Sequence, residues 1–263
     1  MWYVVLFLSL LAAPARAETV EILGPQDVAL RATLLVPDGP PVAPAIVALH
    51  GCGGPYPLRD AQWGEWLRGR GHIVLLPDSF GSRSLGSQCR ERQRVVTASG
   101  LRRQDALAAA RWLAARLGTP AGGVVLLGWS DGGSTVLAAG RAGPGEEDGL
   151  LRGLIAFYPG CRALAQAVGW RPVAPLLVLH GAADDWTPIA PCQALAETVG
   201  REITLVAYPG AYHNFDVDIP IQVLRNIPNS QRGDGTVHVG GDAAARADAM
   251  ARVSAFLAAL PAR

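Results

Sequence analysis

A serine flanked by glycines, in Gly128-Trp129-Ser130-Asp131-Gly132, stands where a short apolar run ends and a helical pattern begins. The apolar run is 124–127, and the helical pattern is 133–142. A Gly-x-Ser-x-Gly turn between a strand and a helix is tight, because a Cβ two residues either side of the serine would collide with neighbouring backbone. The turn exposes the serine hydroxyl at a helix N-terminus, where negative charge is favoured. The pattern predicts a nucleophilic Ser130, the alternative being an ordinary strand–turn–helix.

An acid that could support this nucleophile follows a later apolar run, 176–179. The residues after that run include Asp184 and Asp185. In open α/β sheets the reacting groups lie outside the carboxyl ends of the strands, so the residues after each apolar run are the candidates. A carboxylate at this point would orient a histidine and stabilise its protonated form. We favour Asp184 as this acid, with Asp185 as the alternative.

A histidine that could take the serine proton follows the apolar run 203–208. This residue, His213, comes after Ser130 and Asp184, in the order Ser, Asp, His that such a serine turn uses when it carries a triad. His238 is the rival. The sequence therefore predicts the catalytic triad Ser130–Asp184–His213. The remaining histidines are expected to shape turns or to begin a strand: His50, His72 and His180.

A glycine-rich turn, His50-Gly51-Cys52-Gly53-Gly54, follows the first apolar run of the central region. Glycines let backbone approach a substrate closely. In serine sites of this type, one oxyanion-hole N–H comes from such a loop and the other from the residue after the nucleophile. We expect these N–H groups to belong to Cys52, with Gly53 as the alternative, and to Asp131. A plain tight turn is the other interpretation.

The elements that must position these residues alternate between strand and helix. Short continuous apolar runs are typical of parallel strands buried on both faces. They are 45–49, 73–76, 124–127, 154–157, 176–179 and 203–208. Helical patterns separate them at 63–70, 101–117, 133–142, 190–199 and 243–260. The alternation predicts an α/β fold, a mostly parallel central sheet with helices on both faces, preceded by antiparallel edge strands at 18–23 and 28–36. No repeat divides residues 18–263, so we expect a single domain.

The first 17 residues read as a targeting segment. A short apolar stretch ends in Ala15-Arg16-Ala17, the small-residue pattern of signal-peptide cleavage. The stretch is too short for a comfortable membrane span, although an uncleaved anchor is the alternative. We expect residues 1–17 to be a signal peptide, cleaved after Ala17. The mature chain is then periplasmic or secreted, with no stable membrane span.

Four cysteines, an even number, fit disulfides in an exported protein. We favour the pairs Cys52–Cys89 and Cys161–Cys192, because each pair comes from neighbouring loops on one edge of the expected sheet. Free buried thiols are the alternative. The CxxC spacing of many zinc and redox sites is absent.

The charge balance gives no sign of a polyanionic partner. The whole chain has 23 basic residues against 22 acidic ones, and removal of Arg16 with the targeting segment leaves the two equal. A protein that binds nucleic acid or an anionic membrane is usually basic. We therefore expect no nucleic-acid partner, and a small-molecule substrate instead.

Several side chains near the strand ends could shape a substrate pocket. The segment 83–94 is rich in arginine and could steer an anionic substrate, or it could be a solvated loop. Arg83 or Arg162 could hold a substrate carboxylate as a bidentate partner. Three aromatic residues adjoin the triad and would either line the pocket or pack its loops: Trp129, Trp186 and Tyr212.

Together these residues resemble the dienelactone hydrolase family of the α/β-hydrolase superfamily, from about Ala32 to the C-terminal helix. The resemblance rests on the segments 50–54, 77–81, 128–132, 158–161, 184–188 and 212–215. It implies an α/β-hydrolase fold and an ester or lactone hydrolase. The founding enzymes use a cysteine nucleophile, where this chain has Ser130. A serine needs a general base, whereas a low-pKa cysteine can already be a thiolate, so the dienelactone substrate is not carried over.

The expected reaction is a two-step acyl transfer through an acyl-enzyme on Ser130, performed by a monomer without metal or organic cofactor. A peptidase or an acyltransferase would use the same triad. An alternative of a different class is a non-catalytic binding protein that has kept the fold.

Overall fold

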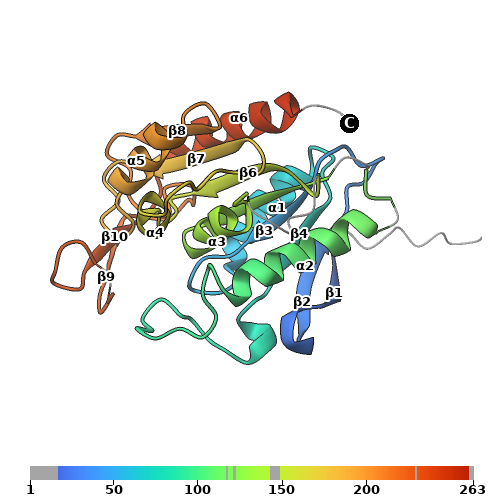
Figure 1. Cartoon of the computed structure of the whole chain (residues 1–263), viewed down its shortest axis with the longest axis horizontal. Coiled ribbons are helices and arrows are strands. Elements are labelled where there is room, and N and C mark those ends of the chain that lie inside the picture. Colours follow the sequence, from blue (N-terminus) through green and yellow to red (C-terminus); the bar gives the residue numbers. More distant parts are fainter. Residues whose placement is uncertain (1–16, 117, 121–122, 143–148, 229, 261–263) are drawn as a thin grey trace, which may run out of the picture.

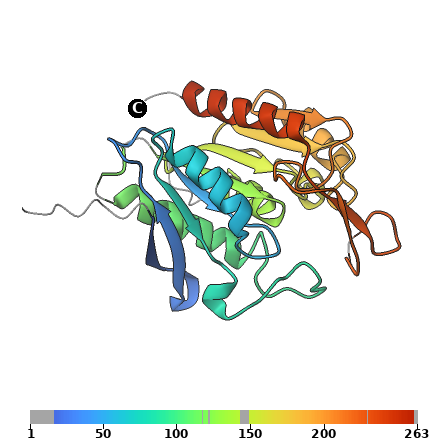
Figure 2. The same cartoon turned by 180° about the vertical axis from the view of Figure 1, so that it is seen from behind.

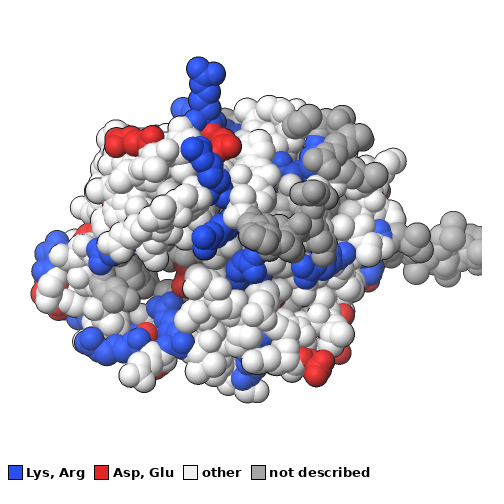
Figure 3. Space-filling view, viewed as in Figure 1, with Lys and Arg blue, Asp and Glu red and all other residues white. Residues whose placement is uncertain are grey.

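The structure is a computed structural model that describes residues 17–116, 118–120, 123–142, 149–228 and 230–260. The expected signal peptide lies outside these residues except for Ala17. None of the helices in the described ranges combines the length and the apolar character that a membrane span requires. Charged side chains are scattered over a mainly uncharged surface in the view of Figure 3.

An eight-stranded sheet forms the centre of the molecule, in the order β1-β2-β4-β3-β5-β6-β7-β8 (Figure 1). Its strands are β1 (Ala17–Leu23), β2 (Ala29–Leu35), β3 (Ala45–Leu49), β4 (Val74–Pro77), β5 (Val124–Trp129), β6 (Leu151–Phe157), β7 (Leu176–Gly181) and β8 (Ile203–Tyr208). Every pair from β4 to β8 is parallel, while β2 runs antiparallel to both β1 and β4. The predicted α/β fold, with a mostly parallel sheet and antiparallel strands at one edge, is confirmed.

Helices cover both faces of this sheet. They are α1 (Pro57–Arg68), α2 (Leu101–Ala115), α3 (Asp131–Ala139), α4 (Arg162–Ala165), α5 (Ala190–Val199) and α6 (Ala243–Ala259), with short 3-10 turns at Pro25–Asp27 and Gly81–Arg83. The core residues of α2, α3 and α5 belong to one apolar cluster, and those of α1 and α6 to another. Figure 2, turned by 180° from Figure 1, brings α1 and α6 to the front.

The two clusters explain why the strands read as unbroken apolar runs. In β5, Val124 and Leu126 pack on the α2 side, whereas Val125 and Leu127 pack on the α6 side. Successive side chains of a strand point to opposite faces, so a strand covered by helices on both faces needs apolar residues throughout. The same alternation holds in β3 and β7.

Element ends differ from the sequence prediction where a local signal outweighs the hydrophobic pattern. Helix α1 begins at Pro57, six residues before the expected start, with the carboxylate of Asp60 accepting the Tyr56 N–H at 2.7 Å. Proline is favoured at the first helical position, and this signal lies outside the apolar pattern. Strand β5 continues through Gly128 and Trp129, because both still pair with β6.

A two-stranded hairpin of β9 (Gln222–Leu224) and β10 (Val237–Val239) extends beyond the carboxyl ends of the central strands (Figure 1). It has its own small apolar cluster, made by Ile227, Val237 and Val239, with Trp186 and Leu224 packed against it. Strands of three residues carry too short an alternation to be recognised in the sequence, and this hairpin was not predicted.

Two disulfides join loops at the carboxyl edge of the sheet, Cys52–Cys89 and Cys161–Cys192. These are the favoured pairs. All four cysteines of the chain are therefore bonded. The first disulfide ties the turn after β3 to the arginine-rich loop, and the second ties the start of α4 to α5.

Three buried histidines hold ends of the central strands. His50 follows β3, His72 precedes β4 and His180 lies near the end of β7. Burial lowers the pKa of each ring below its ordinary value, and in His50 the nearby charge of Arg102 lowers the pKa further. The three rings are therefore neutral in the folded protein at neutral pH.

This neutrality predicts a pH dependence of stability. Histidines of the unfolded chain bind protons below their pKa of about 6.5, whereas the folded histidines stay neutral because their pKa values are lower. The unfolding free energy therefore falls as the pH drops from 7 to 5. Replacing His72 by Gln, which can still donate to the Pro44 carbonyl, should make that fall shallower. Urea unfolding at pH 5, 6 and 7 measures both slopes, and equal slopes for the two proteins would contradict the prediction.

A second prediction concerns the start of α6. The Asp242 carboxylate accepts the Ala245 N–H at 2.9 Å and so caps the helix. Replacing Asp242 by Ala should lower the unfolding free energy by about 1 kcal/mol, since the cap bond is lost. Asp242→Asn, which keeps an acceptor at the cap, is the matched control and should stay within a few tenths of a kcal/mol of the wild type. Equal losses in the two variants would disprove the capping role.

Candidate active site

Ser130 occupies a strained turn between the end of β5 and the start of α3. Its φ is 56° and its ψ is −117°, a positive-φ conformation that residues other than glycine rarely adopt. A Cβ on Gly132 would lie 2.1 Å from the Leu49 carbonyl oxygen, and one on Gly128 would lie 2.4 Å from the Gly132 oxygen. The two glycines are therefore required by close backbone packing, as the sequence predicts for a turn that presents the serine.

Ser130, His213 and Asp184 form one chain of hydrogen bonds. The Ser130 hydroxyl lies 2.9 Å from His213 Nε2, and His213 Nδ1 lies 2.7 Å from Asp184 Oδ2. They lie in the segments that follow β5, β8 and β7 respectively, so all three stand at the carboxyl edge of the sheet. All three are buried, with Ser130 the most exposed at 8%.

The structure gives the two neighbouring aspartates different partners. Asp184 accepts hydrogen bonds from His213 and from the Trp186 and Thr187 N–H groups. Burial raises the pKa of Asp184, but the charge and hydrogen bond of His213 outweigh it, and the net pKa lies below the ordinary value. Asp185 instead lies 2.7 Å from His238 Nδ1.

Asp185 and His238, the alternatives for the acid and the base, thus pair with each other. Asp185 also accepts the His238 backbone N–H at 2.8 Å, and its own carbonyl accepts the Gln231 N–H at 3.0 Å. These contacts hold the β9–β10 hairpin against the loop after β7. The Asp185–His238 pair therefore anchors the hairpin.

A cavity of about 210 Å³ opens beside Ser130 and His213. Its other lining residues are Gly51, Cys52, Gly53, Gly54, Pro55, Tyr56, Arg59, Cys89, Trp186, Asn214 and Leu224. The predicted oxyanion turn and its disulfide therefore form one wall. The β9–β10 hairpin contributes Leu224 to another.

Of the three aromatic residues that adjoin the triad, only Trp186 lines this cavity, with its ring 4.8 Å from that of His213. Trp129 is not among the residues that line the cavity, because its side chain points from β5 into the core, where its ring stacks 5.9 Å from that of Phe157. Tyr212 stacks on His238 at 4.8 Å, outside the cavity lining. Successive residues of a strand or extended loop face opposite sides, so adjacency to a catalytic residue does not place a ring beside it.

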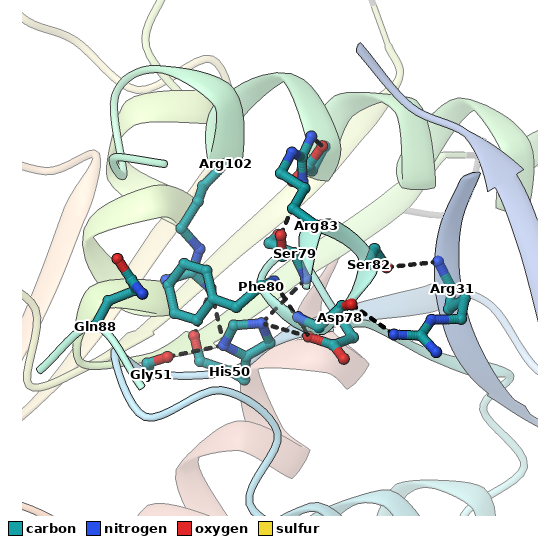
Figure 4. A network of polar contacts seen from close by, with 12 residues as sticks. Arg31, His50, Gly51, Asp78, Ser79, Phe80, Ser82, Arg83, Gln88 and Arg102 are labelled. Atoms are coloured by element: carbon teal, nitrogen blue, oxygen red, sulfur yellow. Dashed lines mark hydrogen bonds and ion pairs between the residues drawn. The ribbon is translucent and has the colours of Figure 1, made fainter. Parts of the chain in front are cut away.

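Arg83, one of the two arginines considered for a substrate carboxylate, is paired within the protein and does not line the cavity. Its guanidinium makes a bidentate ion pair with Asp105 of α2, at 2.8 Å for both bonds, and donates to the Ser79 carbonyl (Figure 4). Asp105 is fully buried and requires a charged partner. Arg162 is exposed, reaches Gln231 at 3.3 Å and does not line the cavity.

Sequence reasoning missed Arg59, which does line the cavity. This buried arginine of α1 lies with its guanidinium 4.5 Å from the centre of the Trp129 ring and 3.4 Å from Asp60. Its Nε has no hydrogen-bond partner. The signal that would have found it is Pro57, since a helix starting there brings Arg59 to the turn after β3.

A buried carboxylate, Asp216, lies behind the histidine. It accepts hydrogen bonds from Tyr158 Oη at 2.6 Å and from Trp63 Nε1 at 2.8 Å, and the Tyr158 ring lies 4.5 Å from that of His213. Burial raises the pKa of both Asp216 and Tyr158. This packing fixes the plane of the His213 ring. Within the described ranges, no group of three or more histidine, cysteine or acidic residues is placed to hold a metal ion.

The fold resembles that of known hydrolases. Thermogutta terrifontis esterase 2, phosphoramylated by tabun, is 22% identical with a TM-score of 0.64, over 94% of this chain and 95% of that one. A dienelactone hydrolase from Anabaena variabilis is 21% identical with a TM-score of 0.64, over 94% and 100%. An α/β serine hydrolase without lid from Xanthomonas campestris is 19% identical with a TM-score of 0.58, over 94% and 98%.

These likenesses show the α/β-hydrolase fold. A comparison with curated protein sequences finds no match. The profile of the dienelactone hydrolase family matches residues 30–260, which is most of the chain. The protein is therefore a hydrolase of the α/β-hydrolase fold and belongs to the dienelactone hydrolase family.

Proposed function

We propose that this protein hydrolyses a carboxylic ester or lactone through an acyl-enzyme on Ser130. The observation that carries the proposal is the unbroken hydrogen-bond chain from Asp184 through His213 to Ser130, with bonds of 2.7 and 2.9 Å. A serine becomes nucleophilic when a base takes its proton, and the base works best when a third group orients it. A protein that only binds a ligand has no need of all three groups.

Each residue then has one task in the reaction. Asp184 keeps a proton on His213 Nδ1, which leaves Nε2 free to accept the Ser130 proton as Oγ attacks the carbonyl carbon. The N–H groups of Cys52 and Asp131 hold the oxyanion of the tetrahedral intermediate. His213 returns the proton to the leaving oxygen. Water then attacks the acyl-enzyme, with His213 again as the base, and releases Ser130.

The comparisons support an ester or lactone as the class of substrate, but they do not identify the individual compound. Thermogutta terrifontis esterase 2 has been captured phosphoramylated by tabun and phosphorylated by paraoxon, so that esterase reacts covalently with organophosphorus compounds. A peptidase or an acyltransferase could use the same residues, and analysis of the products separates them from a hydrolase of small esters.

The two disulfides bear on the cellular location of the protein. We infer that the mature chain begins at Glu18, forms a single domain to Arg263 and works in the periplasm or outside the cell. Two disulfides fit an oxidising compartment. N-terminal sequencing of the exported protein checks the cleavage site.

The nucleophile is tested by intact mass after exposure to a fluorophosphonate. The wild type should gain one adduct, and Ser130→Ala should gain none, because the adduct forms on an activated hydroxyl. Ser134→Ala is the matched control, since Ser134 lies one turn further along α3 with its hydroxyl accepting the Gly160 N–H at 2.8 Å. An adduct on folded Ser130→Ala, or none on folded wild type, would overturn the proposal.

The position of Arg59 predicts that the enzyme prefers esters whose acyl group carries a negative charge. Its buried guanidinium borders the cavity, so an ester carrying a carboxylate in its acyl chain should gain a charge-assisted hydrogen bond. Replacing Arg59 by Met should lower kcat/KM for that ester about tenfold relative to a neutral ester of equal size. Arg162→Met, outside the cavity, should leave the ratio unchanged. An unchanged ratio in Arg59→Met would refute the preference.

A further inference from the structure

Arg102, near the start of α2, reaches both segments of the proposed oxyanion hole, and Figure 4 shows it beside His50 at one of them. Its Nη2 donates to the His50 carbonyl at 2.6 Å, and its Nη1 donates to the Asp131 carboxylate. We propose that Arg102 is a positioning residue that sets the distance between the two oxyanion donors, the N–H groups of Cys52 and Asp131. This inference rests on the proposed function and adds a residue outside the substrate cavity.

One end of the bridge is the turn after β3. His50 comes two residues before Cys52, and its neutral ring holds the turn through both nitrogens. Nδ1 lies 2.8 Å from the Gly51 carbonyl, and Nε2 accepts the Ser79 N–H at 3.2 Å. Since Nε2 is an acceptor, the ring proton belongs on Nδ1, where it is donated to Gly51. The hydrogen bond from Arg102 is therefore made to a turn that the His50 ring already holds in place.

The other end is the first residue of α3. The Asp131 carboxylate accepts hydrogen bonds from Arg102 and from Arg94, whose Nη1 lies 3.1 Å away. Two guanidinium groups share one carboxylate, so the cluster keeps a formal positive charge at the helix N-terminus that faces the developing oxyanion. Fixed positive charge at that point stabilises the transition state without rearrangement.

The two ends are also in direct contact with each other. A Cβ on Gly132 would lie 2.5 Å from the His50 carbonyl oxygen, which accepts the hydrogen bond from Arg102. The loop carrying Arg94 is tied to the same turn by the Cys52–Cys89 disulfide and by the Gln88 N–H, which donates to the Cys52 carbonyl at 2.7 Å. A displacement of Arg102 would therefore shift the turn and the helix relative to each other.

The burial of Arg102 supports a task beyond packing. Its side chain is 1% exposed, and burial lowers the pKa of the guanidinium despite the nearby carboxylate. A buried charge carries a large desolvation cost, and apolar residues often replace such ion pairs without loss of stability. Asp105, which is on the same helix as Arg102, is already neutralised by Arg83. Arg102 is therefore not needed as a partner for Asp105 and can pair with Asp131.

The role has a kinetic signature. Oxyanion donors act within a narrow distance range, about 2.7–3.1 Å, and a misplacement of about 1 Å can cost a hundredfold in rate. In Arg102→Lys, one ammonium cannot keep both planar contacts. We expect kcat to fall about 10- to 100-fold, with KM changed less than threefold and the pH profile of kcat/KM unshifted, because the triad is intact.

The test compares Arg102→Lys and Arg102→Met with Arg103→Met on a chromogenic ester. Arg103 is the matched control, because it also links α2 to α3 but at the far end, where its Nε donates to the Ala138 carbonyl at 3.0 Å. The binding constant of a trifluoromethyl ketone, which forms an oxyanion on Ser130, should weaken in the Arg102 variants by the same factor as kcat/KM. Arg103→Met should change neither.

Two outcomes would overturn the inference. One is full kcat in folded Arg102→Lys, and the other is an equal loss in Arg103→Met. If the Arg102 variants do not fold, Arg94→Met takes their place, since that side chain is 19% exposed and grips the same carboxylate. Full kcat in Arg94→Met would then reject the role. A wild type that turns over no ester and gains no fluorophosphonate adduct would instead refute the proposed function.

Discussion

The structure depends on the close approach of the first turn of α3 to the end of β3. Gly132 meets the Leu49 and His50 carbonyl oxygens at distances that exclude a side chain, and Gly128 meets the backbone of Gly132. This contact holds Ser130 at its positive φ and places the turn after β3 beside it. Ser130 and Cys52 of the glycine-rich turn, which are 78 positions apart in the chain (130 − 52), thereby face one cavity. The strain at Ser130 persists because the packing around it leaves no alternative.

Buried charge is the second organising theme. Asp105 and Asp216 are buried and Asp131 is partly buried. Each has a specific donor set, which is Arg83 for Asp105, Arg94 and Arg102 for Asp131, and Trp63 and Tyr158 for Asp216. A carboxylate removed from water needs such partners. The demand explains why Arg83 serves the scaffold instead of the substrate. It also accounts for Arg94 of the arginine-rich loop, which pairs with Asp131.

The cavity is completed by a part of the chain that carries no strong local signal. The β9–β10 hairpin brings Leu224 to the cavity and packs against Trp186, while the Asp185–His238 pair anchors it to the loop after β7. The two adjacent aspartates therefore have different partners. Asp184 faces His213, and Asp185 holds the wall that encloses it.

The sequence alone determined the parallel sheet, its covering helices and the grouping of Ser130, Asp184 and His213 at one edge, whereas it only favoured the disulfide pairs that the structure contains. Hydrophobic periodicity, glycine spacing and the strand-end rule act over a few residues and can be read locally. Only the tertiary structure decided which cations face the cavity and which face carboxylates. Arg59, Arg83 and Arg102 are alike in the sequence, and their tasks depend on partners 20 or more residues away or on the start of a helix. Long-range pairing of buried charge leaves no local pattern, which is why those assignments required the folded chain.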